Sequence, residues 1–194
     1  MDMQATRPLA VTQQQAWDAL NDPEVLKRCI PGCDKVEATG ENQYAVGVSV
    51  KIGPVSAKFA GKITLSEIVP PQSYTIAFDG QGGAAGFGKG NAQVVLTPTA
   101  TGCDLAYTVH ASVGGKIAQL GQRLIDGAAK GMAEDFFKRF DEDMQRQYPA
   151  AYATDVIANN DHSTPASGQK GLKMPQWAWV AAVALLVGLF LALR

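Results

Sequence analysis

Few residues of this sequence could do chemistry, and their spacing completes no site. Cys29 and Cys33 lie four residues apart, which would suit two metal ligands, but the only histidines are His110 and His162. A closed zinc site needs four ligands, and His110 is expected on the polar face of a strand while His162 lies in a polar, unpatterned stretch. We therefore expect no metal site.

A phosphate-binding loop is excluded in the same way. Residues 83–89 match the first seven positions of the motif, but Gly90 stands where serine or threonine would hold magnesium. A strand pattern follows where a helix should begin. No carboxylate or lysine stands on an apolar face as a candidate acid or base. The sequence therefore predicts a protein that is not an enzyme, with no catalytic residues.

Charge and cysteine content narrow the choice of partners. The formal net charge is −1 and the isoelectric point is near 6.1, whereas nucleic-acid binding needs a concentrated basic surface. No basic stretch followed by an apolar one opens the chain, so we expect no export signal. The three cysteines are an odd number in a presumed cytoplasmic domain, which predicts free thiols. We expect no nucleic-acid partner.

The elements that would position a binding site begin with a strand over residues 1–11 and two short helices. Thr12 and Gln15 predict a helix N-cap with its reciprocal glutamine. Asp22 and Pro23 predict the N-cap and first position of the second helix. From residue 44 to residue 113, apolar residues fall at every second position in about six segments joined by short turns. These segments should pair as an antiparallel sheet.

The apolar period then changes to that of a helix. From Ile117 to Met144, apolar residues recur every three or four positions, which predicts one helix of about thirty residues with a stripe facing a core. Gly121, Gly127 and Gly131 lie inside it, although each costs about 1 kcal/mol relative to alanine. They suggest a close approach to this helix, either by the sheet or by a ligand.

An antiparallel sheet wrapped around one long helix is a helix-grip arrangement of the α+β class. A single helix does not fill a long curved sheet, so we expect an apolar cavity between them. Its predicted lining is Phe59, Ile63, Phe78, Leu105, Tyr107, Leu120, Leu124 and Ile125. Residues 80–90 are either a flexible hairpin connection or a lid or docking loop, with Phe87 as its apolar contact to a ligand or partner and Lys89 as its charge.

The end of the chain has the composition of a membrane anchor. Residues 177–193 carry no charge and would span roughly 25 Å as a helix, near the short limit for crossing a bilayer. A buried core helix is the alternative, but Trp177 and Trp179 stand where an interfacial belt would place them. We interpret residues 175–194 as a single transmembrane helix and residues 148–174 as a flexible linker.

The charges that flank this segment predict its orientation. Lys170 and Lys173 precede it and Arg194 follows it, a bias that favours the N-terminal part on the cytoplasmic side. Residues 1–147 would then form a cytoplasmic domain tethered to a bacterial inner membrane.

Four ordered motifs, which fall within about the first 145 residues, resemble the CoxG family of carbon monoxide dehydrogenase proteins. They are Ile30-Pro31-Gly32-Cys33, Gly53-Pro54-Val55 followed by Phe59-Ala60-Gly61, Gly86-Phe87-Gly88-Lys89-Gly90, and Gly114-Gly115-Lys116-Ile117-Ala118-Gln119-Leu120-Gly121. The resemblance implies a START-like (SRPBCC) domain that holds a hydrophobic ligand. It also implies a role in recruiting a molybdenum-containing carbon monoxide dehydrogenase to the membrane.

The residues and the resemblance together lead to one functional hypothesis. The chain would be a membrane-anchored accessory protein of a molybdenum hydroxylase, and its cavity would hold a respiratory quinone, ubiquinone or menaquinone, with no covalently bound cofactor. Its partners would be the lipid bilayer, the dehydrogenase and this hydrophobic small molecule. The alternatives are a START-like enzyme of the cyclase or aromatase type and a general lipid-binding protein.

Overall fold

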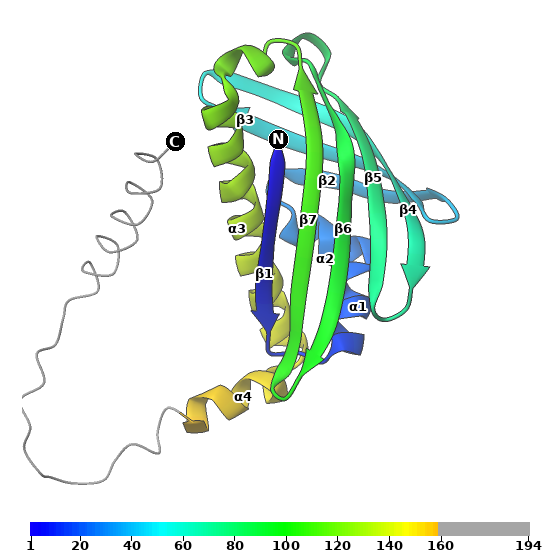
Figure 1. The fold of residues 1–194 in the computed structure, drawn as a ribbon, viewed down its shortest axis with the longest axis vertical. Helices are drawn as coiled ribbons and strands as arrows, with labels where there is room; N and C mark the ends of the chain where they lie inside the picture. Colours follow the sequence, from blue (N-terminus) through cyan, green and yellow to red (C-terminus); the bar gives the residue numbers. More distant parts are fainter. Residues whose placement is uncertain (159–194) are drawn as a thin grey trace, which may run out of the picture. The chain divides into compact units, whose positions relative to one another are not determined.

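One sheet of seven antiparallel strands forms the body of the protein (Figure 1). A computed structural model describes residues 1–158 of the chain. The strands lie in the order β1-β7-β6-β5-β4-β3-β2. Their bounds are β1 (Asp2–Leu9), β2 (Cys33–Gly40), β3 (Gln43–Ile52), β4 (Val55–Val69), β5 (Ser73–Gln81), β6 (Phe87–Thr99) and β7 (Gly102–Gly114). The first strand pairs with the last, and the others follow as consecutive hairpins.

Two short helices, α1 (Gln13–Leu20) and α2 (Pro23–Cys29), carry the chain from β1 to β2. The predicted caps are confirmed. The Thr12 hydroxyl accepts a hydrogen bond from the Gln15 amide, and the Gln15 side chain accepts one from the Thr12 amide at 2.9 Å. Asp22 Oδ1 accepts from the Glu24 amide at 2.8 Å, with Pro23 at the first helical position. Each cap therefore satisfies a donor that the helix itself leaves unpaired.

The alternation in the sequence produces a sheet with one buried face. In β1, for example, Met3, Ala5, Arg7 and Leu9 are more buried than the residues between them. The edge strand β2 was not predicted from the sequence, because only Val36 is buried in it and its other side chains are mostly exposed. A strand without an apolar alternation gives no period-two signal.

The long helix α3 (Gln122–Gln147) starts later than the sequence predicted. Residues 118–120 form a separate 3₁₀ turn, and Gly121 follows it at φ 89°, a left-handed conformation that breaks the helix. The expected close approach to the helical glycines is wrong. A Cβ added at Gly127 or Gly131 would meet nothing within 4 Å.

The predicted linker over residues 148–174 begins with structure. Residues Pro149–Ala158 form helix α4. Tyr148, Ala151 and Tyr152 pack against the core, and the Tyr152 hydroxyl donates to Asp141 Oδ1 at 2.6 Å. The compact unit therefore extends to residue 158 instead of ending at residue 147. The proline and alanine content that suggested a linker also suits a short helix that opens with proline.

The predicted transmembrane helix, residues 175–194, lies outside the described residues. Within residues 1–158, no helix combines the length and the apolar character that crossing a membrane requires.

The main core cluster includes side chains from α1, α2, β6, β7 and the C-terminal half of α3. Its most buried members are Val11, Val25, Cys29, Leu96, Cys103, Phe140 and Met144. All core positions lie between Leu9 and Tyr152, so the unit that the structure describes holds its own core.

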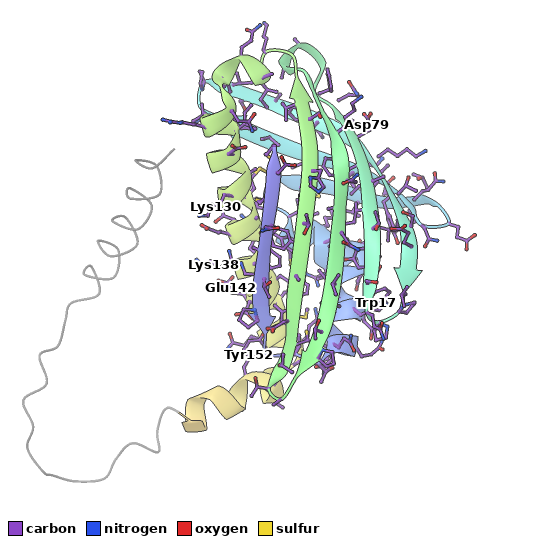
Figure 2. All side chains as sticks on the ribbon, in the orientation of Figure 1. Trp17, Asp79, Lys130, Lys138, Glu142 and Tyr152 are labelled. Carbon is purple, nitrogen blue, oxygen red and sulfur yellow. The ribbon has the colours of Figure 1, made fainter. Side chains whose placement is uncertain are left out.

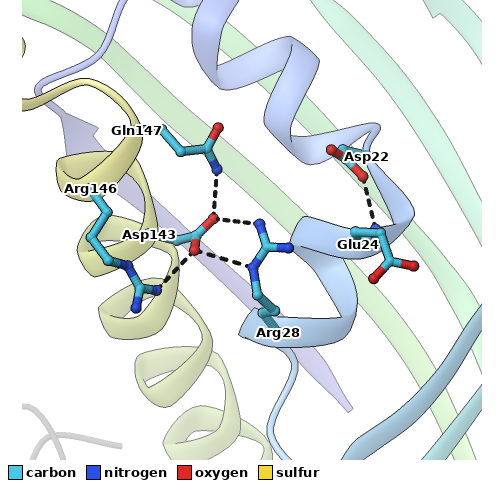
Figure 3. Close-up of polar contacts among 6 residues, drawn as sticks. All are labelled: Asp22, Glu24, Arg28, Asp143, Arg146 and Gln147. Carbon is cyan, nitrogen blue, oxygen red and sulfur yellow. Dashed lines mark hydrogen bonds and ion pairs between the residues drawn. The ribbon is translucent and has the colours of Figure 1, made fainter.

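A buried carboxylate ties α2 to α3 (Figure 3). Asp143 is only 4% exposed and receives two hydrogen bonds from Arg28, at 3.0 and 3.3 Å. Arg146 donates to it at 2.9 Å and Gln147 at 2.7 Å. Burial alone would raise the pKa of Asp143, but the hydrogen bonds from Arg28 and Gln147 outweigh it and hold the pKa below the ordinary value. The carboxylate is therefore charged at neutral pH and fixes the two helices together.

Candidate ligand-binding site

A cavity of about 310 Å³ lies between the sheet and the helices α2 and α3. The strands supply Val46, Ile63, Ile76, Val94, Leu105 and Tyr107, while the helices supply Leu26, Ile30, Ala133, Phe136 and Phe137. No charged residue is among the residues that line it. Its few polar side chains include Asn21, whose amide already donates to the Trp17 carbonyl at 2.8 Å. The site therefore suits an apolar molecule.

Aromatic contacts hold α3 against the sheet beside this cavity. The rings of Phe137 and Tyr107 stack with their centroids 5.5 Å apart. Phe136 meets Phe137 edge to face at 5.2 Å and stacks on Phe140 at 5.8 Å. These pairs fix the distance between helix and sheet. The small side chain of Ala133, one turn earlier on α3, leaves the space open.

The buried tyrosine on the opposite wall stays neutral. Tyr74 is 5% exposed, and its ring meets that of Trp17 edge to face at 5.4 Å. Burial raises the pKa of the Tyr74 hydroxyl far above its ordinary range. It can therefore act in this cavity as a hydrogen-bonding group and not as a base.

Apolar lining continues toward the other end of the sheet. A hollow of about 280 Å³ near the start of α3 is lined by Phe59, Phe78, Phe87, Ile117, Ile125 and Met132 among others. A further hollow of about 290 Å³ shares Ile30, Val46 and Ile63 with the main cavity and Phe59 and Phe78 with the hollow near α3. An elongated apolar molecule therefore finds a continuous row of apolar side chains.

The predicted lining residues fall into three groups. Ile63, Leu105 and Tyr107 line the main cavity. Phe59, Phe78, Phe87 and Ile125 line the hollow near the start of α3.

Leu120 and Leu124 line neither space, which corrects the prediction. Leu120 belongs to the 3₁₀ turn before α3, and Leu124 is 44% exposed. The sequence analysis continued one helical period through Gly121, but the helix starts after that residue. The phase of the apolar stripe therefore does not carry back across the break.

Several lining residues were missed by the sequence analysis although the sequence carried a signal for them. Phe136 belongs to the apolar stripe of α3, and Ile76 and Val94 alternate in their strands. Ala133 and Phe137 stand outside that stripe. Only the rotation of α3 against the sheet turns them into the cavity.

A side opening between β1 and α3 brings charge next to the main cavity. It encloses about 310 Å³ and is lined by Asp2, Met3, Gln4, Ala5, Arg7, Tyr107 and Lys130. Two of these residues, Met3 and Tyr107, also line the main cavity. Lys130 comes from the middle of α3 (Figure 2).

Arg7 holds an unused donor in this opening. Its guanidinium carbon lies 5.6 Å from the centroid of the Phe137 ring. Its Nε is buried and has no hydrogen-bond partner among the described residues. A buried donor without a partner is costly, so an acceptor atom of a ligand would be stabilised there.

The cysteines have the properties of core thiols. Burial raises the pKa of Cys29 and of Cys103 to about 11, so both are protonated at neutral pH. Burial also raises the pKa of Cys33, whose thiol donates to the Lys35 carbonyl at 3.4 Å. Within residues 1–158, no group of three or more histidine, cysteine, aspartate or glutamate side chains gathers as metal ligands would.

The seven-stranded antiparallel sheet, the long helix packed against it and the apolar cavity between them define a START-like protein with the helix-grip fold. Within that class, the chain belongs to the CoxG family of carbon monoxide dehydrogenase proteins, whose family model matches residues 8–145. None of the curated proteins compared with the chain matches it.

Solved structures agree with this fold. A conserved protein from Geobacillus kaustophilus is 35% identical, with a TM-score of 0.71, over 75% of this chain and 96% of its own. Proteins from Chromobacterium violaceum and Rhizobium leguminosarum share the fold at 17% and 14% identity, with TM-scores of 0.56 and 0.59. They cover 73% and 75% of this chain, and 95% of their own chains in both cases. Since the match fills almost all of the Geobacillus kaustophilus chain, this unit folds on its own.

Proposed function

We propose that this chain is an accessory protein of a molybdenum hydroxylase such as carbon monoxide dehydrogenase, with no reaction of its own, and that it carries a respiratory quinone for that enzyme. Membership of the CoxG family supports the accessory role. The observation that carries the quinone proposal is the cavity between sheet and helix, which has no charged residue among those lining it.

The physical need for such a carrier follows from where the two reactants reside. A soluble dehydrogenase releases electrons in water, whereas an isoprenoid quinone is dissolved in the bilayer. Apolar area that leaves water contributes about 25 cal/mol per Å², but the bilayer offers the tail the same gain. Extraction therefore requires a closely fitting apolar site, and the row of hollows along the sheet supplies length for an isoprenoid tail.

A quinone also has two carbonyl oxygens that accept hydrogen bonds. In this proposal, the tail lies in the main cavity and one carbonyl points through the shared wall at Met3 and Tyr107. The buried Nε of Arg7 donates to that carbonyl. This arrangement would satisfy the donor and would orient the head group toward the side opening.

The membrane part of the proposal depends on the end of the sequence. The uncharged stretch of residues 177–193, preceded by Lys170 and Lys173, supports an anchor in the inner membrane with residues 1–158 on the cytoplasmic side. A tethered head stays close to the bilayer, where the quinone is and where the dehydrogenase must be recruited.

A deletion experiment in the source cell tests the function. Without this protein, the dehydrogenase should still reduce a soluble dye at its normal rate but should no longer drive quinone-linked oxygen uptake. Restoring the full chain should restore oxygen uptake, and a chain ending at residue 158 should restore it less well. Unchanged oxygen uptake in the deletion strain would refute the proposal. Turnover of an aromatic or polyketide-like substrate by the purified protein would favour a START-like enzyme instead.

A further inference from the structure

One end of the protein carries positive charge and no acidic residue. This tip is formed by residues 51–54 of the β3–β4 turn, 82–88 of the β5–β6 connection and 114–124 around the start of α3. These segments include Lys51, Lys116 and Arg123 but neither aspartate nor glutamate. The chain as a whole has more acidic than basic residues, 18 against 17, so the charge of the tip differs from that of the rest.

Contacts show that the three segments meet. The Ile117 amide donates to the Ala85 carbonyl at 2.9 Å, and Phe87 lies opposite Gly114 in the β6–β7 ladder. A Cβ added at Gly53 would come within 3.2 Å of a methyl group of Leu124. Figure 1 shows the same arrangement, with the β3–β4 turn beside the first turns of α3 at the end where β7 finishes.

The tip also exposes large apolar side chains. Phe87 is 38% exposed and Leu124 is 44% exposed. Phe87 stands at the rim of the hollow of about 280 Å³, whose lining is almost entirely apolar. The nearest carboxylate on α3 is that of Asp126, which accepts a hydrogen bond from Gln122 at 2.6 Å. Cations beside exposed phenylalanine and leucine around an apolar hollow match the chemistry of an anionic lipid surface.

We propose that this tip docks on the surface of an anionic phospholipid membrane, with Phe87 and Leu124 in the interface and Lys51, Lys116 and Arg123 against lipid phosphates. The docking is a property of residues 1–158 and is separate from any anchor at the end of the chain. It places the rim of the apolar hollow at the lipid surface. The consequence for quinone transfer rests on the proposed function, but the docking itself does not.

Charge complementarity favours lipid over a protein partner as the occupant. Each lysine or arginine close to an anionic membrane strengthens binding about fivefold, and the attraction falls off within a Debye length. Reversing two of the three cations should therefore weaken binding by at least about a hundredfold, because two attractions become repulsions. Binding should also weaken as salt rises.

The test uses ligand-free residues 1–158 and vesicles without quinone, so its result does not depend on quinone binding. The protein should sediment with vesicles containing phosphatidylglycerol and should stay in solution with vesicles of phosphatidylcholine alone. The double variant Lys116→Glu/Arg123→Glu should lose sedimentation. The matched control Lys27→Glu/Lys138→Glu makes the same charge change at exposed positions outside the tip and should bind as the original does.

A second pair of variants separates the apolar contribution from the charge. Phe87→Ser/Leu124→Ser should reduce sedimentation while keeping the salt dependence, and circular dichroism should show the native fold. Equal binding to anionic and neutral vesicles would overturn the proposal, as would unchanged binding by the charge-reversed tip. If the tip variants kept vesicle binding but lost binding to the dehydrogenase, the tip would be a protein-docking surface and the proposal would be wrong.

Discussion

Filling the main cavity from α3 should abolish ligand binding while leaving the protein folded. Ala133 lines the cavity beside Phe136 and Phe137, so Ala133→Phe sends a ring into a space of about 310 Å³. Burying a phenylalanine side chain contributes about 1.5–3 kcal/mol. Inserting extra atoms into a well-packed core costs about 1–3 kcal/mol. Because the space is open, we expect the gain to offset the cost and the unfolding free energy to stay within about 1 kcal/mol of the original.

Urea unfolding of ligand-free residues 1–158 measures the stability, and co-purification with quinone measures the binding. The control Ala128→Phe changes a position on the same helix that does not line the cavities described above, and it should retain quinone. A loss of more than about 3 kcal/mol in Ala133→Phe would mean that the space is not open. Undiminished quinone retention by this variant would mean that the ligand does not occupy the cavity.

Three further substitutions test the packing and the site. Asp143→Ala should lower the unfolding free energy by about 3 kcal/mol, because it leaves buried donors without their carboxylate. Since the pKa of Asp143 is lowered by folding, its stabilisation is present above the ordinary value of 3.8 and is lost as pH falls through the folded value; urea titrations from pH 7 to pH 3 should show a smaller loss of stability for the variant. Thr12→Ala should cost about 1 kcal/mol by removing the cap of α1, measured in the same way. Arg7→Met should weaken quinone binding about fivefold, the worth of one hydrogen bond, and leave binding of an isoprenoid hydrocarbon unchanged.

Local signals in the sequence predicted most of the sheet and the first two helices. The caps at Thr12 and Asp22 depend on residues three positions apart or fewer, so no long-range contact is needed to recognise them. The inward positions of the long strands follow from alternation alone. The same alternation placed Ile63, Leu105 and Tyr107 in the main cavity.

Features set by tertiary contacts could not be predicted in this way. Gly121 reads as one glycine within a helical period, and only its φ of 89° reveals the break that moves Leu124 to the surface. The orphaned Nε of Arg7 depends on how α3 packs against β1, which places Phe137 beside the guanidinium. Neither has a signature in sequence spacing.

The division of the cavity walls shows the same limit. Ala133 contributes by being small, and a small residue carries no periodic signal of its own. Its role follows from the ring of Phe137, stacked on Tyr107 at 5.5 Å, which sets the helix at a fixed height above the sheet.

The most direct measurement is quinone extraction by the protein from vesicles. Residues 1–158 would be mixed with vesicles that contain ubiquinone or menaquinone, separated from them, and extracted with organic solvent for mass spectrometry. The account predicts a stoichiometric amount of quinone with the original protein and almost none with Ala133→Phe. An original protein that emerges without quinone, or a variant that carries as much as the original, would contradict it.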